Sequence, residues 1–195
     1  MMPTTIFYSP TSIQQISSVE EATGRPSIPW THSELVISKD SYAVSQQPLY
    51  CISGLWMEKF RSKTNALWCT GFNIPNVNSA ILGIEFQLNI QRAGRIQDLI
   101  IQLTKDGLTL AGENRASEIN SVQTDMNTGD FTTPLHPVGD FNVYGSSTDL
   151  WGDTWTSTEI SSSTFGIVIS FQSNPIIPHR DLAYVDQVAL RITYA

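Results

Sequence analysis

The sequence predicts an all-β protein: an antiparallel, jelly-roll-like β-sandwich with an extended N-terminal arm. The first observation is a strict alternation of apolar and polar residues in two C-terminal segments. Their apolar positions are Phe165, Ile167, Ile169 and Phe171 in one segment, and Val188, Leu190, Ile192 and Tyr194 in the other. A period of two places alternate side chains on a buried and a solvated face, as in antiparallel sheets. The second observation is that turn-forming residues separate many such short segments, without a convincing long helix.

Residues 1–33 are predicted to form the arm, because they contain few apolar positions that could build a core. Within the arm, residues 11–24 match a short helix that places Ile13 and Ile16 on one face. Ile13, Ile16 and Trp30 are the candidate contact residues of the arm. Such an arm needs a surface to pack on, which is either its own sandwich or a neighbouring subunit.

Residues 34–195 are predicted to form the sandwich domain, with roughly nine or ten strands. After several short strands, a long strand over residues 79–91 is followed by a returning strand over residues 96–104. The inward positions expected on this pair are Ile84, Phe86, Leu88 and Ile90 on the first strand, and Leu99, Ile101 and Leu103 on the second. Asp106-Gly107 then predicts a two-residue hairpin. Residues 141–145 predict one more strand before the two alternating segments close the domain.

Composition limits the classes of partner. The chain has 195 residues, of which 41% are hydrophobic, which is enough for one sizeable core. The net charge is −7 and no cluster of Lys and Arg occurs, so no nucleic-acid partner is expected. No segment has the roughly 18 consecutive apolar residues of a membrane span, so no membrane partner is expected. The first residues lack the basic and apolar regions of a secretory signal, which favours synthesis in the cytoplasm.

Tryptophans offer two kinds of prediction. Trp56 and Trp68 lie within apolar strand patterns and are predicted to be core residues. Trp151 and Trp155 flank Gly152-Asp153 in a polar loop, so they are the candidate surface or ligand contacts. Either one of them plugs the end of the sandwich, or the pair forms a platform on which sugar rings stack.

No catalytic or metal-binding motif is predicted, and no cofactor is expected. Residues 125–130 resemble the beginning of a calcium loop, but its twelfth position is His136 rather than glutamate. The two cysteines and three histidines show no zinc spacing, and we expect the cysteines to be reduced and buried. A glycosidase needs two carboxylates at one cleft, for which Glu85, Asp98 and Asp186 are the strand-associated candidates. Solvated positions are more common for such residues, so the chain is predicted not to be an enzyme.

The C-terminal block resembles structural proteins of tailed bacteriophages. In those proteins a Trp-Gly loop precedes a strand of the type Ser-x-Phe-Gly-Ile-x-Ile, and a strand of the type Val-Asp-x-Val-x-Leu-x-Ile-x-Tyr ends the module. The corresponding residues here are Trp151-Gly152, residues 163–169 and residues 185–194. The long strand pair and its Asp-Gly turn also look like part of such a module. The resemblance covers about residues 80–195 and implies a jelly-roll-like virion module used for assembly or adhesion.

The leading hypothesis is a non-enzymatic structural or adhesion component of a bacteriophage particle, in its tail, baseplate or fibre region. Such a protein would be made in the host cytoplasm, reside in the virion, form a homo-oligomer and contact other virion proteins. A capsid decoration (cement) protein is the close alternative. A carbohydrate-binding module that uses Trp151 and Trp155 against a host-surface glycan is a further alternative. A polysaccharide-degrading enzyme is the third class of hypothesis.

Overall fold

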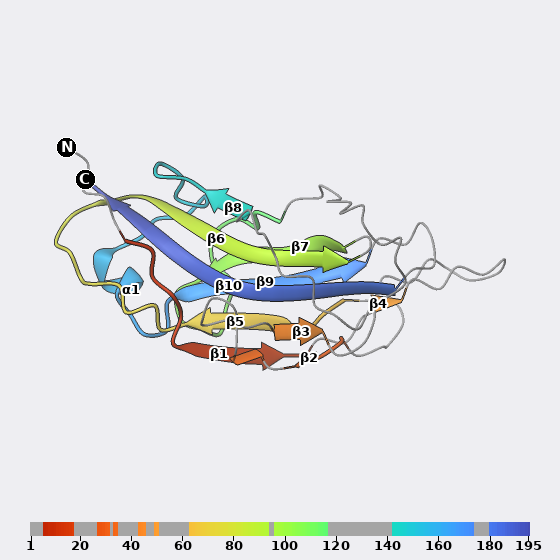
Figure 1. Cartoon of the computed structure of the whole chain (residues 1–195). Coiled ribbons are helices and arrows are strands. Elements are labelled where there is room, and N and C mark those ends of the chain that lie inside the picture. The colour runs from red at the N-terminus through yellow and green to blue at the C-terminus, as the bar shows by residue number, and fades with distance from the viewer. Residues whose placement is uncertain are drawn as a thin grey trace.

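The computed structural model describes residues 6–17, 27–31, 33–34, 43–45, 49–50, 63–93, 96–116, 142–173 and 180–195. Over these residues the chain forms two antiparallel sheets and one short helix, which confirms the predicted all-β sandwich (Figure 1). The jelly-roll connectivity stays a prediction.

The smaller sheet has four strands in the order β1-β5-β9-β7. Their bounds are Ser12–Ile16 for β1, Ala66–Thr70 for β5, Gly166–Ser173 for β9 and Ile96–Thr104 for β7. The larger sheet has the order β2-β3-β10-β6-β8, and β4 also pairs with β10. The bounds of these strands are Trp30–Thr31 for β2, Ala43–Ser45 for β3, Leu49–Tyr50 for β4, Ile81–Ala93 for β6, Asn142–Gly145 for β8 and Arg180–Tyr194 for β10. The helix α1 spans Ser157–Ile160.

The core lies between the two sheets and is built by the alternating positions. All eight apolar residues of the two C-terminal segments are buried, as predicted, and so are the four of the long strand β6. On β7 the prediction holds only in part, because a bulge between Asp98 and Ile100 changes the phase of the strand. Leu99 is therefore half-buried rather than inward, whereas Ile101 and Leu103 are fully buried. A bulge adds one residue to a strand, and the alternation pattern does not predict its position.

The predicted arm helix is wrong over Ser12–Ile16, which form the strand β1. This strand pairs with β5 in continuous register from Ser12 opposite Thr70 to Ile16 opposite Ala66. A short isolated helix is marginal in water, whereas the edge of β5 offers backbone hydrogen bonds to an extended segment. Residues 18–26 lie outside the described part of the chain.

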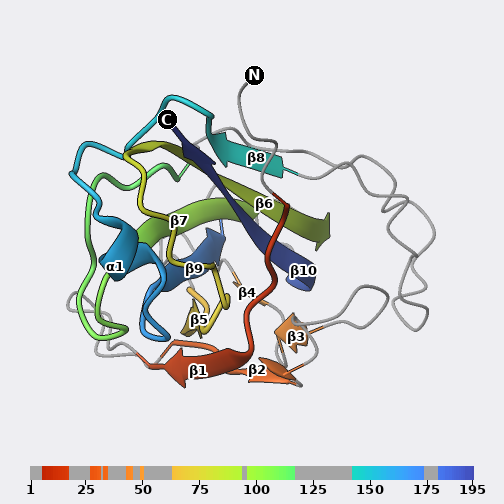
Figure 2. The same cartoon turned by 90° about the vertical axis from the view of Figure 1, so that its left-hand side faces the viewer.

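The N-terminal arm connects the two sheets along one side of the sandwich (Figure 2). Tyr8 exchanges two backbone hydrogen bonds of 2.8 Å with Leu190 of β10, in the larger sheet. Three residues later, the Thr11 amide donates to the Thr70 carbonyl of the smaller sheet at 3.1 Å, and the Thr11 hydroxyl donates to the Gly71 carbonyl at 2.8 Å. The arm was predicted to pack either on its own sandwich or on a neighbouring subunit. The described part of the arm packs on its own sandwich.

Two side-chain amides cover strand edges where backbone groups would otherwise be unpaired. Gln15 on β1 accepts from the Trp30 amide at 2.8 Å and donates to the Trp30 carbonyl at 3.0 Å, which joins the edges of the two sheets. Asn114 accepts from the Ile101 amide at 2.9 Å and donates to the Leu99 carbonyl at 2.9 Å, along the outer edge of β7. Unpaired strand edges can pair with other chains. Each of these side-chain amides makes the two hydrogen bonds that one residue of an adjacent strand would make, and so covers part of an edge.

Candidate functional site

The loops that gather around α1 at one end of the sandwich form the candidate site (Figure 2). Residues 105–116 follow β7, and residues 146–165 connect β8 to β9 and contain α1. We refer to these two segments as the loop cluster. Their backbones meet where the Glu113 amide donates to the Trp151 carbonyl at 2.6 Å.

Trp151 fixes the loop cluster to the larger sheet. Its side chain is completely buried, and the indole N–H donates to the Ile84 carbonyl of β6 at 2.9 Å. Its own amide donates to the Asp149 carboxylate at 2.7 Å, which supports a positive backbone φ of 57°. Gly145 packs against the indole so closely that an added Cβ would lie 2.6 Å from the indole nitrogen. The loop is thus shaped around Trp151.

Trp155 is also turned inward, with 7% of its surface exposed. Its indole N–H donates to the Leu150 carbonyl at 2.8 Å, and its ring meets Phe165 edge-on with a centroid separation of 5.6 Å. The prediction that Trp151 and Trp155 form an exposed ligand platform is therefore wrong. Each indole satisfies its N–H on a backbone carbonyl and buries its ring, whereas Gly152 and Thr154 between them are exposed. The other prediction, that one of the two plugs the end of the sandwich, agrees with the burial of both tryptophans.

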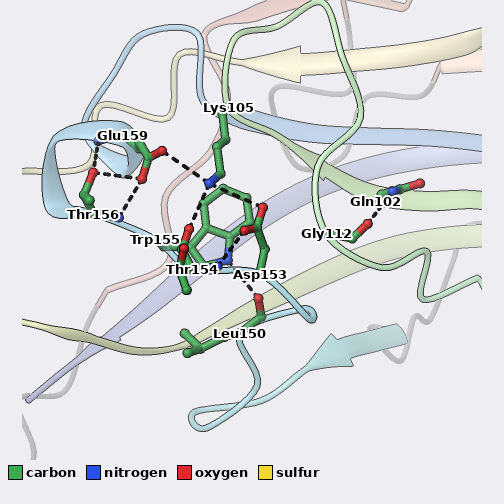
Figure 3. A network of polar contacts seen from close by, with 9 residues as sticks. All are labelled: Gln102, Lys105, Gly112, Leu150, Asp153, Thr154, Trp155, Thr156 and Glu159. Atoms are coloured by element: carbon green, nitrogen blue, oxygen red, sulfur yellow. Dashed lines mark hydrogen bonds and ion pairs between the residues drawn. The ribbon is translucent and has the colours of Figure 1, made fainter.

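Lys105 ties the two parts of the loop cluster together (Figure 3). Its ammonium donates to the Thr154 carbonyl at 2.8 Å and lies 3.3 Å from carboxylate oxygens of both Asp153 and Glu159. It also lies 4.7 Å from the centroid of the Trp155 ring. Partial desolvation lowers the pKa of Lys105, but the bonds and charges of the two carboxylates outweigh it and raise the pKa overall.

The helix α1 begins with a capping box, which orients Glu159 toward Lys105. The Thr156 hydroxyl accepts from the Glu159 amide, and the Glu159 carboxylate accepts from the Thr156 amide at 2.7 Å. This backbone hydrogen bond is the main reason why the pKa of Glu159 is lowered, and Lys105 adds to it. The pKa of Asp153 is lowered chiefly by the Thr154 amide. Both carboxylates therefore stay charged beside the lysine.

The turn Asp106–Leu110 differs from the predicted two-residue hairpin. The Asp106 carboxylate accepts from the amides of Leu108 and Thr109, each at 2.8 Å, and from the Thr109 hydroxyl at 2.8 Å. These bonds lower the pKa of Asp106 to about 2, the Thr109 amide first. Because the side chain takes amides that a strand would use, the chain next pairs with β7 at the bridge between Leu103 and Ala111.

A shallow hollow of about 700 Å³ opens beside α1. Its lining is neutral and mostly polar: Asn76, Asn78, Ser79, Ala80, Ser157 and Thr158. The Ser157 hydroxyl holds this wall together, because it contacts both Asn76 and the Val77 backbone. The hollow offers amide and hydroxyl groups to a ligand, but its lining contains no aromatic ring for stacking.

The three candidate carboxylates have separate partners. Glu85 is paired with Arg191 on the neighbouring strand β10. Asp98 on β7 accepts from the Tyr144 hydroxyl of the other sheet at 2.8 Å. The carboxylate of Asp186 accepts from the side-chain Nδ2 of Asn89 at 2.9 Å. Each of these carboxylates therefore bonds to a residue on another strand and helps to hold strands or sheets together.

The remaining predicted residues fall into three groups. Trp30 is buried, donates from its indole to the Asn65 carbonyl at 2.9 Å and contacts Phe171 edge-on, so this arm residue anchors to its own core. Ile13 packs partly against the core, and Ile16 is 36% exposed. Trp68 is buried, as predicted, with 8% of its surface exposed, and it lies on the opposite face of β5 from Leu67.

Several predictions concern residues outside the described part of the chain. These residues are Trp56, Cys51, the segment 125–130 and the three histidines His32, His136 and His179. Cys69 is a free, buried thiol whose pKa is raised by desolvation. Among the described residues there is no group of three or more His, Cys, Asp or Glu side chains that could hold a metal ion. The described helix is also too short to cross a membrane.

Four organising residues were not predicted as such from the sequence: Lys105, Asp106, Gln15 and Asn114. A signal for Asp106 was present, because an aspartate followed by Gly-x-Thr is suited to accept bonds from the amides that follow it. The partners of the other three lie on segments distant in sequence or at strand edges. In comparisons with known proteins, the chain matches no protein-family model, no curated protein and no solved structure.

Proposed function

We propose that this chain is a non-enzymatic structural component of a bacteriophage particle, in the tail, baseplate or fibre region, and that it acts through protein–protein contacts. Capsid decoration is the alternative position for the same activity. Other virion proteins and further copies of the chain are its proposed partners.

The observation that best supports this proposal is the structural role of the residues that carry the resemblance. Trp151 bonds to the larger sheet, and Phe165 is completely buried against Trp155. Gly166 lets β9 approach β5, since an added Cβ would lie 2.0 Å from the Cys69 carbonyl oxygen. The last strand, β10, pairs with β6 along twelve residue pairs in the middle of the larger sheet. These residues build a rigid frame, which is what an assembly module requires.

Immuno-electron microscopy tests the proposal directly. Antibodies raised against the purified chain should label tailed particles from the source culture at one fixed position. Label on the tail, baseplate or fibres supports the leading position, and label spread over the head assigns the chain to capsid decoration. Particles that stay unlabelled, while the same antibody detects the chain elsewhere in the lysate, would overturn the proposal.

A further inference from the structure

The turn Asp106–Leu110 presents two leucine side chains to solvent. Leu108 is 76% exposed and Leu110 is 43% exposed. Single exposed leucines are ordinary on protein surfaces. Two of them on one short turn are a different feature, because hydrogen bonds fix the backbone at Leu108, Thr109 and Ala111.

The rigidity of the turn comes from bonds on both of its sides. Asp106 accepts the three hydrogen bonds described above, and the Gly107 amide donates to the Thr104 hydroxyl at 3.0 Å. The Lys105 carbonyl accepts from the Thr164 hydroxyl at 3.0 Å, which fixes the turn to the segment before β9. A surface that is already ordered loses little conformational entropy when it binds. The backbone of the turn would therefore lose little conformational entropy on binding a partner.

Charge indicates the chemistry of the partner. Lys105, Asp106, Asp153 and Glu159 give this region one positive and three negative charges. An anionic lipid surface would repel such a region. A protein surface with basic side chains around an apolar recess would complement both the leucines and their surroundings.

We propose that the turn Asp106–Leu110 is an assembly contact: Leu108 and Leu110 insert into an apolar recess, bordered by lysine or arginine side chains, on another protein of the particle. This inference rests on the proposed function and adds to it the contact surface and the chemistry of the partner.

The test measures incorporation into particles. Epitope-tagged full-length chain is supplied in the host during infection, as wild type, as the double variant Leu108→Ser/Leu110→Ser and as the control Val143→Ser. Val143 is 53% exposed on β8, outside the turn. We expect the double variant to co-sediment with particles at least about tenfold less than wild type, because two apolar side chains lose their burial. The control should stay within about twofold of wild type, and thermal unfolding should show all three folded.

The other outcomes separate the inference from the proposed function. Wild type that never co-sediments overturns the proposed function, and the inference with it. Wild type and double variant incorporated equally overturn only the inference. Two measurements on purified chains test other occupants. Sedimentation velocity that shows self-association lost in the double variant would assign the turn to a contact between copies. Leucine-dependent binding to phosphatidylcholine–phosphatidylglycerol vesicles would assign it to a membrane. Either result would overturn the proposed partner.

Discussion

The Trp151 loop and the Asp106 turn are neighbours in the loop cluster, and both are fixed by aspartate side chains that accept backbone amides. They differ in where their apolar side chains go. The first loop buries an indole completely against β6, whereas the second directs two leucines into solvent. Order and burial are therefore separate properties of a loop. In the first loop the ordered backbone positions a buried side chain, and in the second it carries two exposed side chains.

Replacing Trp151 should have the largest effect, because its buried indole connects the loop to β6. Trp151→Ala should lower the free energy of unfolding by about 3–5 kcal/mol, because it leaves a cavity and an unpaired Ile84 carbonyl. Trp151→Phe keeps a ring but loses the hydrogen bond, so we expect a smaller loss of about 1–3 kcal/mol. Urea unfolding followed by circular dichroism measures both variants. Equal stability of Trp151→Ala and wild type would show that the loop does not depend on its indole.

Removing Lys105 tests the connection between the two loops. Lys105→Met should lower the free energy of unfolding by about 0.5–1 kcal/mol, because its ion pairs are partly exposed. The raised pKa of Lys105 means that its stabilisation is present below pH 10.5 and is lost as pH rises through the higher pKa of the folded state. The difference between variant and wild type in urea unfolding should therefore shrink at alkaline pH. Lys63→Met is a control outside the loop cluster, and a similar pH-dependent difference for it would contradict the assignment.

Asp106→Asn should have the smallest effect on the whole fold and a specific effect on the turn. The pKa of Asp106 is lowered from 3.8 to about 2, so its stabilisation of the turn is complete above pH 3.8 and is lost as pH falls toward 2. In wild type, the NMR amide signals of Leu108 and Thr109 should shift over this interval. In Asp106→Asn they should be nearly independent of pH there. Unchanged titration in the variant would mean that another carboxylate controls the turn.

The alternation of residues was sufficient to predict the strands that form the core, because burial on one face acts at every second position. It could not predict the bulge beside Leu99, which depends on one inserted residue. It also misassigned residues 12–16, because the spacing of Ile13 and Ile16 suits a helical turn while the deciding partner, β5, lies fifty or more positions away. At the candidate site, Trp151 and Trp155 were identified, but the choice between an inward plug and an outward platform stayed open. The backbone carbonyls of Ile84 and Leu150 that accept their N–H groups cannot be assigned from the sequence.

The bridge between Tyr8 and Leu190 joins residues that lie far apart in the sequence. During synthesis Tyr8 is made long before Leu190, so this contact forms only after β10 has been translated, and such distant pairings slow folding. The other partner of the arm, β5, is translated much earlier, so β1 can pair with it before β10 exists. The arm therefore docks in two steps separated in time. Between these steps, the unpaired backbone at Tyr8 is exposed to mispairing with strands of neighbouring copies.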